Sequence, residues 1–288
     1  MAITIEKAYI DTFESNVRHL AQQSAARLRN HVTERGLRSS AHGWDRIAKS
    51  EAVTKATKLA ATPSMESAWT RRVDVPVVKH WGDTYEEQDI VQMLIDPQSN
   101  LTMAGASAMG RALDDIIIAN ATGNALDGDG AAVAFPAGQQ LGGATIVFSF
   151  DLVTQCSEKF LTNDIDPDEP KVMVIGPTQM RKLMQLTEAT SGDYVSVKAL
   201  AEKGYIESWM GYSWVVSNRL TIPVGGELYC LAMTKKALGL TMRSDIKTNV
   251  AQDPTLSFAY RVYMQATYGV VRVEDEHIIR VHVKNSLT

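Results

Sequence analysis

The stretch "NLTMAGASAMGRALDDIIIANATGNA" (residues 100–125) decides the fold. Its apolar and small residues lie on two stripes at helical spacing, which predicts a helix over about residues 100–121. At 1.5 Å per residue this helix is about 33 Å long. Because the stripes cover much of its circumference, we expect the helix to be packed on more than one side. Gly105 and Gly110 let neighbouring backbone approach it closely.

The same stretch also contains Gly105-Ala-Ser107-Ala-Met-Gly110, which superficially resembles a serine nucleophile elbow. That motif requires G-x-S-x-G at a sharp turn from a strand into a helix, where the hydroxyl is exposed. Here the spacing is one residue too long, and the serine lies inside a predicted helix. We therefore predict that Ser107 is a packed small residue and not a nucleophile.

Composition places the chain among ordinary globular proteins, with 288 residues, 45% of them hydrophobic, and a net charge of −4. The charge is unevenly spread. Residues 1–72 carry 12 Lys or Arg against 7 Asp or Glu, and the rest carries 17 against 26. This pattern indicates a basic N-terminal arm on an acidic body, or equally a solvated helical face.

Motifs for chemistry are missing from the sequence, so we predict no catalytic residues, no metal site and no cofactor. Cys156 and Cys230 lie in apolar runs and are expected to be buried, reduced thiols. Asp127-Gly-Asp-Gly130 starts like a calcium loop but lacks the closing Glu, which favours a turn. The six histidines show no metal-ligand spacing. No apolar run is long enough to span a membrane, and no signal peptide is recognisable, so we expect a soluble intracellular chain.

The remaining elements follow in a defined order. Residues 11–31 have helical spacing, and Val73, Val75 and Val77 alternate with polar residues as in a half-buried strand. We expect residues 69–89 to form a long hairpin that turns at "HWGD" (80–83). The later part alternates helices and strands: a helix capped by Ser149, a buried strand at 171–176, a helix from Pro177, a helix near 195–203, and strands at 212–217, 227–233, 256–273 and 277–283.

Taken in this order, the chain resembles the major capsid proteins of tailed bacteriophages, which have the Hong Kong 97 fold, and within them a podophage-type branch. The resemblance is carried by four strings: "DTFESNVRHLAQQSAARLRNHV" (11–32), "ATPSMESAWTRRVDV" (61–75), "DIVQMLIDPQSNLTMAGASAMGRALDDIIIANATGNA" (89–125) and "FPAGQQL" (135–141). The implied fold class is α+β. The implied segments are an N-terminal arm (1–66), an extended hairpin loop (67–92), a peripheral domain (93–147 and 255–288) with the spine helix 100–121, and an axial domain (148–254).

The resemblance also implies a function: self-assembly into an icosahedral virion shell around double-stranded DNA, bound without sequence specificity. A separate scaffolding protein, a portal and a decoration protein are implied partners, and assembly would take place in the cytoplasm of the bacterial host. Arg71, Arg72 and Lys79 are the candidate contacts between subunits, because they lie on the expected hairpin. Two alternatives are a cellular nanocompartment shell and a cytosolic enzyme with a site assembled from scattered residues.

Overall fold

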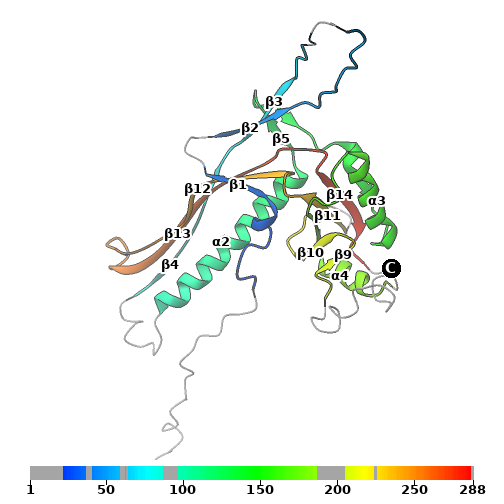
Figure 1. Cartoon of the computed structure of the whole chain (residues 1–288). Helices are drawn as coiled ribbons and strands as arrows, with labels where there is room; N and C mark the ends of the chain where they lie inside the picture. Colours follow the sequence, from blue (N-terminus) through cyan, green and yellow to red (C-terminus); the bar gives the residue numbers. More distant parts are fainter. Residues whose placement is uncertain are drawn as a thin grey trace, which may run out of the picture.

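Three β-sheets and one long helix organise the chain (Figure 1). The structure is a computed structural model that describes residues 22–36, 41–58, 62, 64–86, 97–186, 205–223 and 226–286. The helices are α2 (Pro97–Thr122), α3 (Phe150–Thr162) and α4 (Pro177–Met184), with 3-10 turns η2 (Arg29–His31) and η3 (Ala137–Gln139).

The predicted long helix is confirmed as α2, which begins three residues earlier than expected. It lies along a four-stranded sheet, called here the long sheet. Its strands in spatial order are β1 (Thr33–Gly36), β12 (Leu238–Asp253), β13 (Ala259–Arg272) and β4 (Val77–Tyr85). Alternate residues of β13, including Val262, Met264 and Ala266, are buried on the α2 side. The sheet therefore buries one face against the helix, as period-two patterning requires.

A six-stranded sheet forms the second body of the molecule. Its strands in spatial order are β7 (Gln140–Gly142), β14 (Ile278–Lys284), β11 (Glu227–Thr234), β8 (Lys171–Ile175), β10 (Tyr212–Val216) and β9 (Ser208–Trp209). Helix α3 buries Leu152, Cys156 and Phe160, and the ring of Phe160 lies 6.4 Å from that of Tyr212 on β10. The capping position of Ser149 and the buried character of β8 are confirmed, as is Pro177 at the start of α4.

The third sheet carries the projection seen at the top of Figure 1. Its strands in spatial order are β2 (His42–Ile47), β3 (Trp69–Asp74), β5 (Ala125–Asp127) and β6 (Ala132–Val133). Strands β2 and β3 are antiparallel, from the pair His42 and Asp74 to the pair Ile47 and Trp69. Residues 42–74, with the connection 48–68 between the two strands, are called the hairpin below.

The hairpin expected within residues 67–92 is therefore wrong in its pairing. Strand β3 pairs with β2 and β5, whereas β4 belongs to the long sheet and pairs with β13. The expected turn at residues 80–83 lies inside β4. Gly82 stands opposite Tyr263 within the continuous pairing of β4 with β13, so the chain does not turn there.

Sheet membership also differs from the expected segment boundaries. Strand β12, expected in the axial segment, pairs with β13 in the long sheet. Strand β14, expected in the peripheral segment, lies inside the six-stranded sheet beside β11. The chain passes between the two sheets at residues 273–277, between β13 and β14.

Two expected helices cannot be followed fully. Residues 11–21 and the segment 195–203 lie outside the described residues. The part of the first helix that is described, residues 22–31, is irregular up to Leu28 and then forms only the turn η2. Among the described residues, no helix is both long and apolar enough to cross a bilayer.

Candidate functional site

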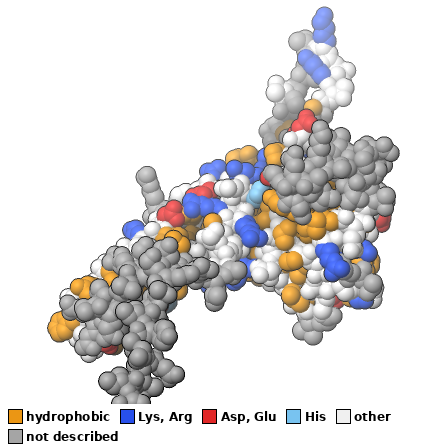
Figure 2. Space-filling model, turned by 90° about the horizontal axis from the view of Figure 1, so that it is seen from below, with side chains coloured by type: hydrophobic (Ala, Val, Ile, Leu, Met, Phe, Trp, Pro, Cys, Tyr) orange, Lys and Arg blue, Asp and Glu red, His pale blue; other side chains and the backbone are white. Residues whose placement is uncertain are grey.

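The hairpin exposes large apolar side chains on a narrow projection. Ile47 and Trp69 are 57% and 69% exposed where the two strands meet the connection, and Val53 and Met65 are exposed in the connection. Lys55 and Lys58 are exposed there as well, and Figure 2 shows basic side chains at the end of the molecule's narrow projection. Exposed apolar groups gathered on a protruding element are typical of a surface that binds another protein.

Arg71 lies on the exposed face of the hairpin. Its Nε donates a hydrogen bond of 2.6 Å to Oδ1 of Asp45, the residue directly opposite on β2. This hydrogen bond lowers the pKa of Asp45 and raises the pKa of Arg71. The side chain of Arg71 remains 56% exposed, so it keeps surface for a further contact.

Arg72, the next residue, points the opposite way and is only 4% exposed. Its Nη2 donates to Oδ2 of Asp275 at 2.9 Å. Asp74 is buried too, and it accepts hydrogen bonds from the backbone N–H of His42 and the hydroxyl of Thr241. The expected alternation is therefore inverted: Arg72 and Asp74 are buried, and Val75 is 59% exposed.

The base of the hairpin contains a second buried arginine. Arg272 is fully buried, and its Nε donates to Oδ1 of Asp275. Its other guanidinium nitrogens donate to the carbonyls of Gly123, Val133 and Ala134, and its guanidinium carbon lies 5.0 Å from the centre of the Phe135 ring. Asp275 therefore joins the hairpin to the residues that follow α2.

Lys79 does not lie on the hairpin. It is a half-buried residue of β4 that pairs with Ala266 of β13, on the sheet face that also carries Trp81 and packs on α2. The three candidate contacts are thus separated: Arg71 is on the hairpin surface, Arg72 is in its buried base, and Lys79 is on the edge strand of the long sheet.

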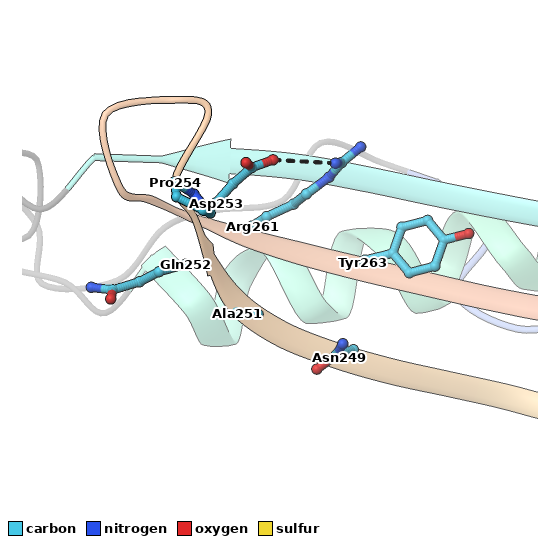
Figure 3. A pocket seen from close by; sticks show the side chains of 7 residues that line it. All are labelled: Asn249, Ala251, Gln252, Asp253, Pro254, Arg261 and Tyr263. Atoms are coloured by element: carbon cyan, nitrogen blue, oxygen red, sulfur yellow. Dashed lines mark ion pairs between the residues drawn. The ribbon is translucent and has the colours of Figure 1, made fainter.

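A shallow groove lies beside the connection between β12 and β13, on the face of the long sheet away from α2 (Figure 3). It has a volume of about 360 Å³. Arg261 forms an ion pair of 3.5 Å with Asp253, and its guanidinium lies 6.0 Å from the ring centre of Tyr263. Leu256 and Phe258 are exposed at the adjoining strand connection. The charged groups of this groove are exposed and paired with each other, an arrangement that suits a contact surface.

The groups that resemble catalytic or metal sites are structural. Ser107 is 4% exposed within α2, and the helix needs its small neighbours: a Cβ on Gly110 would lie 3.0 Å from the backbone nitrogen of Ala26. Cys156 and Cys230 are free and buried, and burial raises the pKa of each thiol to about 12. Asp127 accepts backbone N–H groups of its own turn. The described residues contain no cluster of His, Cys, Asp or Glu able to hold a metal.

Sequence reasoning missed Asp275 and Arg272. Arg272 stands in the apolar run "YGVVRV", and a charged residue in such a run is a signal of buried ion pairing. Its partner lies three residues on, in the acidic turn "EDE" (274–276).

The comparison with protein families decides what this arrangement belongs to. The family described as "Phage capsid protein" matches residues 5–285, nearly the whole chain. The chain belongs to the phage capsid protein family. This capsid protein is a structural component of the virion shell and not an enzyme. No curated protein sequence matches it significantly.

Solved structures show that the capsid protein has the Hong Kong 97 type of fold. A chain from the capsid of the cyanophage P-SCSP1u is 18% identical, with a TM-score of 0.77; the match covers 99% of this chain and 96% of that one. A chain of the mature capsid of bacteriophage PhiM1 is 16% identical, with a TM-score of 0.70 and coverage of 96% and 92%. A capsid chain of Ralstonia phage GP4 is 8% identical, with a TM-score of 0.73 and coverage of 96% and 95%. The predicted fold class is confirmed.

Proposed function

We propose that this capsid protein is the major subunit of a tailed phage of the podophage type, and that its copies close into an icosahedral shell around double-stranded DNA. The family match over residues 5–285 carries this proposal. The projecting hairpin supports it, because its connection exposes large apolar side chains, Val53 and Met65, which gain stability when a partner covers them. A closed shell repeats many modest contacts of this kind by symmetry.

The segments receive assembly roles that follow the observed sheets. The hairpin, residues 42–74, is the extended loop that lies over a neighbouring subunit. Helix α2 and the long sheet are the peripheral part, and the six-stranded sheet with α3 and α4 is the axial part around the five-fold and six-fold axes. The arm is then the chain before β2.

Arg71 and Lys79 are the proposed contacts between subunits. Arg71 keeps more than half of its side chain exposed on the hairpin, and Lys79 lies on an edge strand of the long sheet. Arg72 is left out of this surface, because its side chain is buried and bound to Asp275 of its own chain.

A charge exchange tests the role of Arg71. The variant Arg71→Glu breaks the pair with Asp45 and reverses the charge on the hairpin surface. The double variant Arg71→Glu with Asp45→Arg restores an ion pair within the hairpin and keeps the reversal at position 71. We expect both variants to fold and both to form fewer shells in electron micrographs. Full recovery of shells in the double variant would show that Arg71 serves only its own hairpin.

The packaged DNA, a scaffolding protein, a portal and a decoration protein are proposed partners. The excess of Lys and Arg in residues 1–72 supports a non-specific DNA contact, because basic groups bind DNA phosphates whatever the base sequence. Such binding weakens as the salt concentration rises. Binding of a random DNA duplex that is equally strong in low and high salt, or no binding at all, would contradict this contact.

A further inference from the structure

Asp275 stands between arginines that come from two parts of the molecule. Its Oδ2 accepts from Arg72 of β3, and its Oδ1 accepts from Arg272 of β13. Burial and the charge of Arg72 lower the pKa of Arg46 on β2, against the charges of Asp275 and Glu274, and its Nη1 donates to the carbonyl of Val273 at 2.9 Å. Asp275 therefore binds two arginines directly, and a third lies near it at the base of the hairpin.

We infer that Asp275 is a positioning residue, which fixes the direction of the hairpin relative to α2 and the long sheet. It thereby sets the angle at which the hairpin meets a neighbouring subunit. This inference rests on the proposed function of the hairpin as a contact between subunits.

On the hairpin, Arg72 has few hydrogen-bond partners other than Asp275. In the part of the chain that is described, Asp275 accepts the one hydrogen bond of the Arg72 guanidinium, and the Nε of Arg72 is buried without a partner. Pairing between β3 and the next strand, β5, extends over only two residues, Arg72 and Val73. So short a ladder gives β3 little backbone support, and its direction depends also on side-chain contacts with the rest of the molecule: Arg72 with Asp275, and Asp74 with Thr241 of β12.

The body side is rigid by comparison. Arg272 donates to the carbonyl of Gly123 at 2.6 Å and to those of Val133 and Ala134 at 3.2 and 3.1 Å. Gly123 directly follows the last residue of α2. Arg272 therefore fixes the position of Asp275 relative to the end of α2. Asp275 in turn fixes the position of Arg72 on the hairpin.

The contact between the hairpin and the long sheet depends on the negative charge of Asp275. With Asp275 ionised, the two buried arginines share one anion. Without its charge they are two unscreened cations in a low-dielectric site, which repel each other and push β3 away from β13. The isosteric variant Asp275→Asn removes the charge and leaves the shape. Arg72→Met is a second variant that removes the same link and keeps the pair between Asp275 and Arg272.

The test measures hairpin direction in the unassembled subunit. Spin labels are placed on exposed positions by Thr54→Cys in the hairpin and Glu158→Cys on α3, and the distance distribution is recorded by pulsed electron resonance. Cys156 and Cys230 are 1% and 0% exposed, so they do not take up the label. Two controls are included. Val174→Ala destabilises the buried strand β8 away from the hairpin, and Asp253→Asn neutralises a carboxylate at the far end of the long sheet.

We expect Asp275→Asn and Arg72→Met to broaden the distance distribution and to reduce uniform shells, while both controls leave the distribution narrow. An unchanged distribution in Asp275→Asn would overturn the inference. Equal broadening in Val174→Ala at the same loss of melting temperature would also overturn it, because the effect would then be one of general stability. Normal shells from a variant with residues 48–68 shortened to a tight turn would instead contradict the proposed function of the hairpin.

Discussion

Gly105 of α2 and Trp81 of β4 are in direct contact, and the glycine has no room for a side chain. A Cβ at position 105 would lie 2.6 Å from Cε3 of Trp81 and 2.8 Å from the sulfur of Met264. Met264 is paired with Trp81 across the sheet, so both strands approach the helix at this one residue. The small residues of the "GASAMG" string therefore serve the packing of α2 on the long sheet.

Gly105→Val should lower the free energy of unfolding by about 3 kcal/mol, since either the indole or the helix must shift to admit the new side chain. Urea denaturation of the unassembled subunit measures this loss. Gly138→Ala is the control, because nothing lies within 4 Å of a Cβ at that position. Equal stability of the two variants would mean that α2 and β4 are not in close contact.

Asp114 of α2 holds the N-terminal segment onto the helix. It is 1% exposed and accepts hydrogen bonds from the backbone N–H groups of Arg27 and Leu28. Asp114→Ala should cost about 3 kcal/mol, because it leaves buried donors without an acceptor. Its neighbour Asp115 pairs with Arg219 near the surface, so Asp115→Ala should cost less than about 1 kcal/mol.

Limited proteolysis provides a second measurement for this pair of variants. We expect cleavage around residues 22–32 to be faster in Asp114→Ala than in Asp115→Ala. The same rate in both would show that Asp114 does not anchor this segment.

The lowered pKa of His282 predicts how the stability of the protein depends on pH. Burial, and then the charge of Arg280, lower its pKa from 6.5; burial also lowers the pKa of His31. The unfolded chain therefore binds protons more readily than the folded one. The stability associated with these groups is complete above about pH 6.5 and falls as the pH decreases through that value.

Urea midpoints recorded between about pH 5.5 and pH 7.5 measure this slope. His282→Gln should flatten it by removing one of the two titrating groups. A midpoint that rises on acidification would contradict the assignment of a neutral, buried imidazole to the folded state.

The long helix could be predicted from the sequence because its signal is local. Small and apolar residues recur at helical spacing over more than six turns of residues 100–121, and the packing of Gly105 and Gly110 confirms the reason for their size. Helix α3 was predictable for the same cause, with Leu152, Cys156 and Phe160 on one face.

The hairpin could not be placed from the sequence because its determinants are distant in the chain. The partner of Arg72 is 203 residues away, and Thr241, a partner of Asp74, is 167 residues away. The local sequence pattern places the side chains of Arg72 and Asp74 on the solvent face, whereas the structure buries both. Arg111 likewise has distant partners: it donates to Gln22 and to the carbonyl of Gln23.

Strand β12 was missed for another reason. Its second half, "RSDIKTNVAQD" (243–253), is largely exposed and polar, so it has no apolar alternation. Pairing with β13 along nearly its whole length determines its conformation, and local propensity contributes little.

Electron microscopy of the purified protein, alone and co-expressed with the proposed scaffolding protein, tests whether copies of this chain build a closed shell. We expect closed particles of one uniform diameter, with the hairpin of each subunit lying over its neighbour. A small oligomer that stays unassembled under both conditions would contradict it.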